Sequence, residues 1–230
     1  SSAQQRLWFL DQLETERAQY NLPVALRIEG PLDRAALARS LSEIARRHET
    51  LRSRFVAVEG RPELKIDPAL ESLPIRVSEL PSEASVEPWL TERAASPFDL
   101  TQGPLWRIEL ARLAEDTHVL LVTLHHIVCD GWSLGALLRE LATLYKAFTR
   151  GEPAELPPLP IQYTDYAAWQ QQQAAHDAHA AQLDWWREQL RSLPPALELP
   201  TDRPRPARLS HRGGHVPFAL SADLSNAVEA

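Results

Sequence analysis

Two adjacent histidines, His125 and His126, follow an almost wholly apolar run and precede Asp130 and Gly131. The unperturbed pKa of histidine is about 6.5, so an imidazole exchanges protons readily near neutral pH. A neutral imidazole has one acceptor nitrogen and one donor nitrogen. It can take a proton from an amine, or hold the lone pair of that amine toward an acyl carbon. These residue types therefore favour a site for proton transfer or acyl transfer.

Side chains alternate between the two faces of a strand, so neighbouring histidines at a strand end cannot both face one substrate. We expect one of His125 and His126 to face a cleft while the other packs inside. Asp130 is placed to orient a histidine, or to pair with a buried arginine and fix the loop. Gly131 permits close backbone approach to a ligand and a positive φ, and its N–H near a helix N-terminus favours a developing oxyanion.

Other interpretations of the same residues remain open. Taken alone, a histidine pair is as compatible with a structural or surface role as with catalysis. A metal site built from His125, His126, Cys129 and Asp130 is disfavoured, because the two histidines diverge and no second ligand cluster at metal spacing is present. Cys129 would need an activating base to act as a nucleophile, and it fits better as a small buried hydrophobic residue.

The elements that would hold these residues alternate between helix and strand patterns. A strand predicted over 118–124 is apolar enough to be covered on both faces, and a strong helical stripe runs over 131–148. Further strands are predicted at 20–29, 51–58, 64–66, 75–77, 105–113 and 214–220, and further helices at 3–13, 33–48, 86–95, 163–173 and 178–190. The pattern predicts an α/β fold with a mixed sheet and flanking helices.

Two proline-rich stretches, 153–160 and 194–206, are typical of connectors. We expect a lobe that carries the histidine pair over residues 1–175, and a crossover helix, a linker and the start of a second lobe over residues 176–230. A helix predicted to begin near Ser221 would be marginal after two turns, and the chain contains no Met. We therefore expect native sequence to continue beyond this segment.

Charge, hydropathy and cysteine content indicate which partners and which compartment to expect. The formal net charge is −7 without a long basic run, so we expect no nucleic-acid partner. No apolar run approaches the ~20 residues that span a bilayer, so we expect no membrane partner. The single cysteine, Cys129, excludes an internal disulfide and fits a reducing compartment, which predicts a cytoplasmic location.

Four short motifs follow one another along the chain. They are Ser1-x-Ala3-Gln4-x-Arg6-Leu7-Trp8-x-Leu10, Arg47-His48-Glu49-x-Leu51-Arg52-x-x-Phe55, His125-His126-x-x-x-Asp130-Gly131-Trp132-Ser133 and Tyr163-x-Asp165-Tyr166-Ala167-x-Trp169. In this order they resemble the motifs of condensation domains from nonribosomal peptide synthetases, with Ser53, Leu124 and Cys129 as mild departures. Arg6 and Arg52 are implied to be architectural residues held in salt bridges. The resemblance extends over essentially all 230 residues.

The resemblance implies two lobes, each like chloramphenicol acetyltransferase, with a tunnel between them. Donor and acceptor peptidyl carrier proteins would dock at the two tunnel mouths and deliver thioesters on phosphopantetheine arms, next to an adjoining adenylation domain. The chain itself would need no cofactor and no metal. The opening motif and the segment 20–23 resemble the subtype that joins an L-configured donor to an L-configured acceptor.

Motif position also implies roles for the candidate site residues. His126 would lie in the tunnel and position or deprotonate the attacking α-amine, with His125 in a supporting position. Asp130 would hold the loop through an arginine. Gly131 would permit close approach of the thioester and assist the oxyanion.

The resulting hypothesis is an amide-forming acyltransferase, which condenses a carrier-bound aminoacyl or peptidyl donor with an aminoacyl acceptor. One alternative is a non-catalytic condensation-like module that docks a carrier protein or a tailoring enzyme. Another is a stand-alone acyltransferase of the same superfamily that uses coenzyme A, which the long motif match disfavours. Because the later motifs of the second lobe are absent, we expect this N-terminal half to be inactive by itself.

Overall fold

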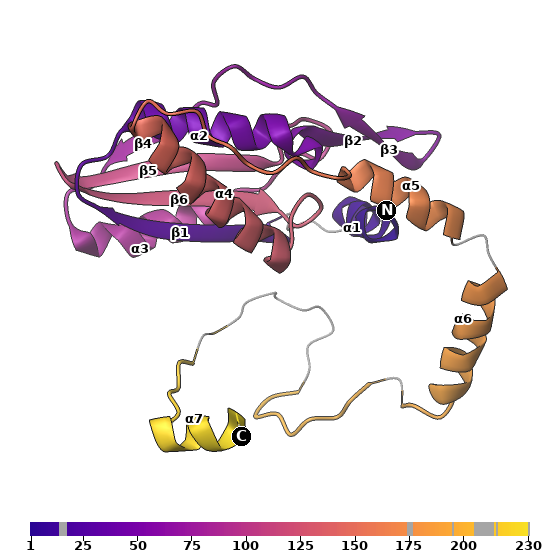
Figure 1. The fold of residues 1–230 in the computed structure, drawn as a ribbon. Coiled ribbons are helices and arrows are strands. Elements are labelled where there is room, and N and C mark those ends of the chain that lie inside the picture. The colour runs from indigo at the N-terminus through magenta and orange to yellow at the C-terminus, as the bar shows by residue number, and fades with distance from the viewer. Residues whose placement is uncertain (14–17, 174–176, 195, 205–213, 215, 230) are drawn as a thin grey trace. The chain divides into compact units, whose positions relative to one another are not determined.

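The computed structural model describes residues 1–13, 18–173, 177–194, 196–204, 214 and 216–229 (Figure 1). The chain divides into two compact units, Ser1–Glu188 and Gln189–Ala230. The boundary predicted from the sequence, between residues 175 and 176, lies outside the described residues and stays a prediction. All four candidate site residues belong to the first unit.

The first unit contains the sheets and most of the helices. In chain order its elements are α1 (Ser2–Leu13), β1 (Asn21–Glu29), α2 (Arg34–Arg47), η1 (Glu49–Arg52), β2 (Ser53–Val58), β3 (Arg61–Ile66), β4 (Arg76–Glu79), η2 (Glu83–Ser85), α3 (Val86–Ala94), β5 (Trp106–Ala114), β6 (Thr117–His125), α4 (Gly131–Thr149) and α5 (Tyr163–Gln173). α6 (Asp177–Gln189) ends at the start of the second unit, which contains α7 (Ala222–Glu229). No helix in the described ranges is both long enough and apolar enough to cross a membrane.

The central sheet carries the histidine pair at the end of an inner strand. Its strands run in the order β1-β6-β5-β4, with β6 antiparallel to both neighbours and β4 parallel to β5. β2 and β3 form a separate antiparallel pair. Leu124 is opposite Leu22 on one side and Trp106 on the other, so β6 is paired on both sides almost to its end.

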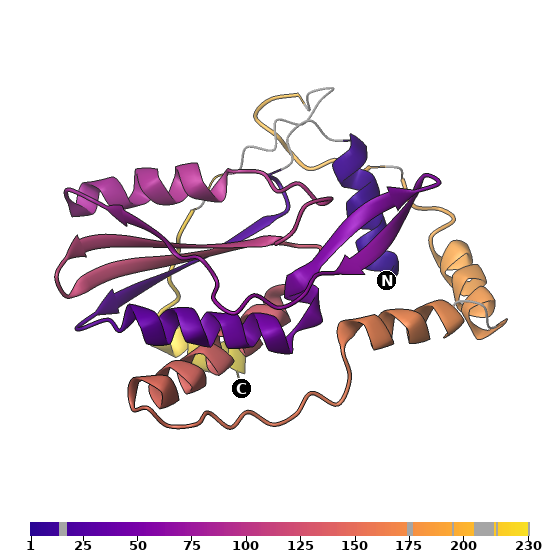
Figure 2. The ribbon, with the colours of Figure 1, turned by 90° about the horizontal axis from the view of Figure 1, so that it is seen from above.

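Helices cover both faces of this sheet. Figure 2 shows α3 on one side and α2 and α4 on the other. The side chains of β6 alternate to match: Val122 and Leu124 belong to the large core with α2 and α4, whereas Val119 and Leu121 pack with Trp89 of α3. A strand covered on both faces needs apolar residues on both, which explains the continuous apolar run in this part of the sequence.

Helices α2 and α4 both begin at an aspartate. Oδ1 of Asp33 accepts a hydrogen bond from the N–H of Ala36 at 2.9 Å, and Oδ1 of Asp130 accepts one from the N–H of Ser133 at 2.9 Å. Such N-caps satisfy backbone N–H groups that the first helical turn leaves unpaired. The second cap starts α4 five residues after β6 ends, which places the helix N-terminus beside the histidine turn.

The prediction of a strand over residues 214–220 is wrong. Gly214 and residues 216–220 are described, and they form no strand. Val216 and Phe218, on the apolar side of the alternation, are 85% and 86% exposed. An alternating pattern forms a strand only where a neighbouring strand takes up its hydrogen bonds, and none of the described strands pairs with this segment.

Candidate active site

The histidine pair lies where β6 ends and the chain turns toward α4. The N–H of His125 donates to the carbonyl of Leu105 at 2.9 Å, and the N–H of His126 donates to the carbonyl of Tyr20 at 2.8 Å. The N–H of Val128 then closes a turn on the carbonyl of His125 at 3.0 Å. The two histidine N–H groups point to opposite neighbouring segments, as those of consecutive strand residues do, and the two side chains diverge in the same way.

His125 is fully buried, with 0% of its surface exposed. Its Nδ1 accepts a hydrogen bond from the N–H of Ile127 at 3.1 Å, so a neutral ring carries its hydrogen on Nε2. The ring lies edge-on to Phe98, with 6.2 Å between centroids. Burial, with a smaller contribution from His126, lowers the pKa of His125 to about 4. His125 is therefore neutral at physiological pH, and it shapes the turn.

His126 is exposed and lines a cavity of about 580 Å³ beside the turn. The remaining lining comes from α1, Tyr20, the end of α2 with His48, η1, the turn itself and the starts of α4 and α5. Gln4 attaches α1 to the turn, because its Nε2 donates to the carbonyl of Ile127 at 3.2 Å. The side chain of His126 forms no hydrogen bond within the described part of the chain, which leaves its ring nitrogens available to a ligand.

Asp130 is the N-cap of α4. Its Oδ1 accepts hydrogen bonds from the N–H of Ser133 at 2.9 Å and from the hydroxyl of Ser133 at 2.6 Å. These bonds favour the charged form and lower the pKa of Asp130. Among the residues that the structure describes, no ion pair reaches this carboxylate, so the arginine contact implied by the resemblance is not found. The cap directs the carboxylate toward the first turn of α4 instead.

Gly131 is the first residue of α4. Its φ is not positive, in contrast to the described glycines Gly30, Gly60 and Gly151. A Cβ atom at this position would meet no atom within 4 Å, so packing within the described chain does not require glycine here. The open space leaves room for a ligand, and the N–H of Gly131 belongs to the positive end of a 19-residue helix.

Cys129 also lines the cavity. Burial, followed by the charge of Asp130, raises the pKa of the Cys129 thiol to about 11. The nucleophile is the thiolate, so a thiol with such a pKa is inert at neutral pH. In the described ranges, no cluster of three or more His, Cys, Asp or Glu side chains is arranged to hold a metal ion.

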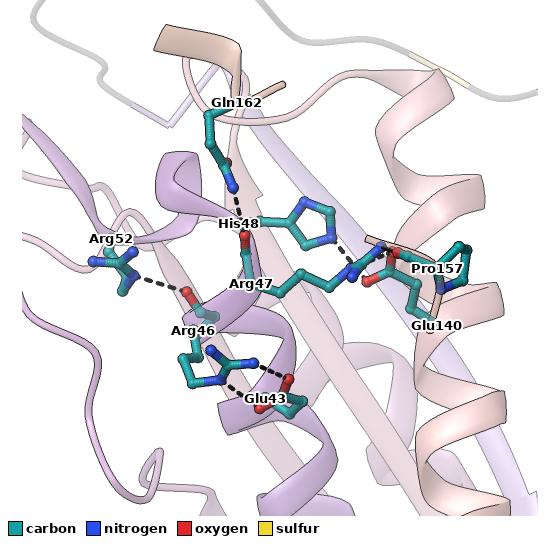
Figure 3. A network of polar contacts seen from close by, with 9 residues as sticks. Glu43, Arg46, Arg47, His48, Arg52, Glu140, Pro157 and Gln162 are labelled. Carbon is teal, nitrogen blue, oxygen red and sulfur yellow. Dashed lines mark hydrogen bonds and ion pairs between the residues drawn. The ribbon is translucent and has the colours of Figure 1, made fainter. Parts of the chain in front are cut away.

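A polar network joins the end of α2 to α4 and includes the cavity residue His48 (Figure 3). The carboxylate of Glu140 accepts a hydrogen bond from Nε of Arg47 at 3.1 Å and binds Nε2 of His48 at 2.8 Å. Arg47 also donates to the carbonyl of Pro157, and its own carbonyl accepts from Nε2 of Gln162 at 2.9 Å. The network fixes the segment from which His48 reaches the cavity.

Sequence reasoning missed Gln4 and His48 as cavity residues. Both lie within the four motifs, but their partners are far away along the chain. Gln4 and Ile127 are 123 residues apart, and His48 and Glu140 are 92 residues apart. No local spacing rule connects residues at such separations, so the motifs themselves were the only available signal.

The two arginines of the first motifs are not in salt bridges within the described residues. Nε of Arg52 donates to the carbonyl of Ala45 at 2.9 Å, and its Nη1 donates to the carbonyl of Asp67 at 2.5 Å. Arg52 therefore has an architectural contact, but with backbone oxygens. Arg6 is exposed and lines the cavity beside His126.

A family model described as Condensation domain matches residues 1–230. The chain belongs to the condensation-domain family. Malpinin synthetase from Mortierella alpina is 48% identical over 233 residues, which cover 100% of this chain and 3% of that protein. Phosphinothricin tripeptide synthetase PhsC from Streptomyces viridochromogenes is 44% identical over 235 residues, which cover 99% of this chain and 22% of that protein. This condensation-domain chain therefore spans a small part of the curated relatives it matches.

Solved structures show the same fold. The X-domain from teicoplanin biosynthesis matches with a TM-score of 0.87 and 36% identity, over 100% of this chain and 52% of that chain. The first condensation domain of the calcium-dependent antibiotic synthetase, in complex with a substrate analogue, matches with a TM-score of 0.75 and 26% identity, over 85% of this chain and 49% of that chain. The predicted family and the predicted mixed α/β fold, like that of chloramphenicol acetyltransferase, are confirmed. The chain spans about half the length of these solved structures.

Proposed function

We propose that this condensation-domain chain serves amide-bond formation between two carrier-bound substrates in nonribosomal peptide synthesis. The donor is an aminoacyl or peptidyl thioester and the acceptor is an aminoacyl thioester, each on the phosphopantetheine arm of a peptidyl carrier protein. The observation that carries the proposal is the contrast within the histidine pair. His126 is exposed at the cavity with its ring nitrogens unoccupied by the described chain, while His125 is fully buried.

In the proposed step, the α-amine of the acceptor attacks the carbonyl carbon of the donor thioester. The C–N bond forms and the C–S bond breaks. The amine loses one proton and the leaving thiolate gains one, so atoms and charges balance without a further reactant. A ring nitrogen of His126 accepts a hydrogen bond from the amine and so directs its lone pair, or takes the proton itself.

Three neighbours support this step in the proposal. His125 holds the turn through the N–H of Ile127, so that His126 keeps its position at the cavity. Asp130 fixes the start of α4 through its cap. The N–H of Gly131 lies at the helix N-terminus, where the positive end of the helix dipole would stabilise the oxyanion of the tetrahedral intermediate.

The proposal implies donor and acceptor carrier proteins and an adjoining adenylation domain as partners. The phosphopantetheine arms belong to the carriers, and the chain would supply no cofactor of its own. The resemblance to the subtype for L-configured donors and acceptors extends the proposal to substrate stereochemistry. The single, buried Cys129 supports a cytoplasmic location, where thiols stay reduced.

We also propose that residues 1–230, as the N-terminal half of a domain, do not turn over substrates by themselves. The support is their coverage of about half of the solved relatives, 52% and 49% in the teicoplanin X-domain and the calcium-dependent antibiotic synthetase domain. Amide formation by this segment alone, with both loaded carriers present, would contradict this part of the proposal.

A non-catalytic docking module is the second candidate. It is favoured by the similarity to the X-domain, which has also been solved in complex with OxyB, and that structure matches this chain with a TM-score of 0.84. Docking does not require a histidine with free ring nitrogens beside a capped helix N-terminus. The presence of His126 and Asp130 in the lining of one cavity, with Gly131 at the adjoining helix N-terminus, therefore favours the enzyme.

The test compares wild type with His126→Ala in the full synthetase that carries this chain, with donor and acceptor loaded on their carriers. We expect the rate of amide formation to fall by about 100-fold or more, the usual contribution of a positioned proton-transfer group. Gln171→Ala, on the exposed part of α5, is the control and should keep the wild-type rate.

The outcomes separate the two candidates. Equal rates of amide formation by wild type and His126→Ala would show that His126 takes no part in the chemistry. Carrier binding without product, for wild type with several matched substrate pairs, would establish the docking module instead.

A further inference from the structure

The cavity beside His126 has an apolar inner wall and a polar mouth. Ile44, Leu51 and Leu137 line it and are 0%, 4% and 6% exposed, so they form its inner end. Arg6 and His126 line it and are exposed, so they mark its mouth. A group that enters past His126 therefore meets mainly hydrocarbon at the far end.

The formal charges at the cavity offset each other. The guanidinium of Arg6 and the carboxylate of Asp130 both belong to the lining. The hydroxyl of Tyr163, also in the lining, is hydrogen-bonded to Oγ of Ser1 at 2.9 Å. An ionised group that moved inward from the mouth would lose water without gaining a free counter-charge, which is costly. The inner part of the cavity thus suits an uncharged group.

When its ring is neutral, His48 supplies one hydrogen-bond acceptor in this lining. Its Nε2 lies 2.8 Å from Oε2 of Glu140, and Nε of Arg47 lies 3.1 Å from the other carboxylate oxygen (Figure 3). A carboxylate accepts, so Nε2 of His48 carries the hydrogen, and Nδ1 of the neutral ring is an acceptor. No hydrogen bond within the described chain occupies Nδ1, and the side chain is 25% exposed.

Two other polar groups of the lining behave differently. Tyr20 and Thr50 also line the cavity, but a hydroxyl both donates and accepts and can rotate to suit its partner. The ring of His48 is held by Glu140, which is itself held by Arg47, so its acceptor keeps one direction. The ring of His48 thus differs from these hydroxyls, because neighbouring side chains hold it in place.

We propose that this cavity receives an uncharged, largely apolar side chain of a carrier-bound substrate, and that Nδ1 of His48 accepts a hydrogen bond from a donor on that side chain. The phenol of tyrosine combines an apolar ring with such a donor. A cavity of about 580 Å³ is within the usual range for small-ligand sites. The inference rests on the proposed function for the source of the side chain, and it adds a specificity-determining residue to it.

The first test measures binding without turnover. Pantetheine conjugates of tyrosine, O-methyltyrosine and phenylalanine, joined through a stable amide, are titrated by calorimetry into the full synthetase. One series has a free α-amine, to represent the acceptor, and the other is N-acetylated, to represent the donor. In one of the two series, we expect tyrosine to bind about three- to tenfold more tightly than the other two, the usual worth of one partly exposed hydrogen bond.

Two substitutions then assign the preference to His48. His48→Leu removes the acceptor and should bring the tyrosine-to-phenylalanine ratio to about one. His48→Gln can still donate to Glu140 and accept from the ligand, so it should keep part of the preference. Each ratio is measured within one protein, so a general change in stability affects both ligands equally.

The results overturn the inference in two ways. Equal binding of tyrosine, O-methyltyrosine and phenylalanine by wild type in both series would exclude a donor-selective pocket, whatever the variants do. A preference that persists unchanged in His48→Leu would place the acceptor elsewhere. Amide formation from phenylalanine-loaded carriers is assayed in parallel. It reports on the proposed function alone, so failure of one idea is distinguishable from failure of the other.

Discussion

At the end of β6, the side chains of His125 and His126 lie on opposite faces of the strand and differ in burial and in hydrogen bonding. On the inner side, His125 is fully buried, and Nδ1 of its ring accepts a hydrogen bond from the N–H of Ile127. On the outer side, His126 lines the cavity, and no described residue forms a hydrogen bond with its ring nitrogens. Two consecutive residues therefore have different roles: His125 stabilises the turn, and His126 is available for chemistry. Substitutions on the inner side should therefore change stability, and substitutions on the outer side should change the chemistry.

The largest expected effect comes from the core side. Leu121→Ala, on the same face of β6 as His125, should lower the free energy of unfolding by about 2–5 kcal/mol, because Leu121 is buried and its truncation leaves a void in a packed core. Leu10, which lines the cavity and is only partly buried, is the matched control, and Leu10→Ala should cost about 1 kcal/mol or less. Urea denaturation of both variants checks the contrast. Equal losses would mean that the cavity wall is packed as tightly as the core.

A smaller, pH-dependent effect belongs to His125. Its pKa falls from 6.5 to about 4 on burial, so the folded state stays neutral where the unfolded chain takes up a proton. The contribution is fully present above pH 6.5 and is lost as the pH falls toward 4, by about 3 kcal/mol in total. Unfolding free energies measured from pH 7 to pH 4 should show this loss.

Two variants isolate that contribution from the titration of carboxylates. His125→Asn keeps an acceptor for the N–H of Ile127 but does not titrate, so its stability should fall less steeply below pH 6.5. His126→Ala should keep the wild-type slope. If His126→Ala, and not His125→Asn, made the unfolding free energy less dependent on pH, the assignment of this effect to His125 would be wrong.

The smallest of the three effects on stability concerns Asp130, the N-cap of α4. Asp130→Ala should destabilise the chain by about 1 kcal/mol, the usual cost of losing an N-cap, whereas Asp130→Asn should cost a few tenths. Because hydrogen bonds from Ser133 lower the pKa of Asp130, its contribution is present above the ordinary carboxyl pKa and is lost as the pH falls through the lowered value. Thermal unfolding at pH 7 compares the two variants. A loss of several kcal/mol in both would indicate a buried ion pair in place of a cap.

Much of the fold could be predicted from periodicity alone. The apolar run at β6 predicted a strand covered on both faces, and the stripe that follows it predicted α4, because these patterns report burial directly. The divergence of His125 and His126 also follows from the two-residue period of a strand. Such local rules succeed where the neighbouring chain supplies most of the environment of a residue.

The remaining features depend on contacts between distant parts of the chain. The pair of His48 and Glu140 and the contact of Gln4 with Ile127 form only after α1, α2 and α4 pack together, so local spacing could not reveal them. The alternation at 214–220 failed for the converse reason, since it lacks a described strand to pair with. The capping role of Asp130 was within reach of the sequence, because Ser133 lies one helical turn later, but the family resemblance favoured an arginine partner.

β1 is an edge strand of the central sheet, so it could meet strands of other molecules in a crowded solution. One edge of β1 pairs with β6, and no described strand pairs with the other. An open edge of this kind can recruit foreign strands and begin aggregation. Pro23 has no N–H to offer a newcomer, and the exposed Arg27 and Glu29 add charge along the same strand. β1 thus carries its own protection against edge-to-edge association.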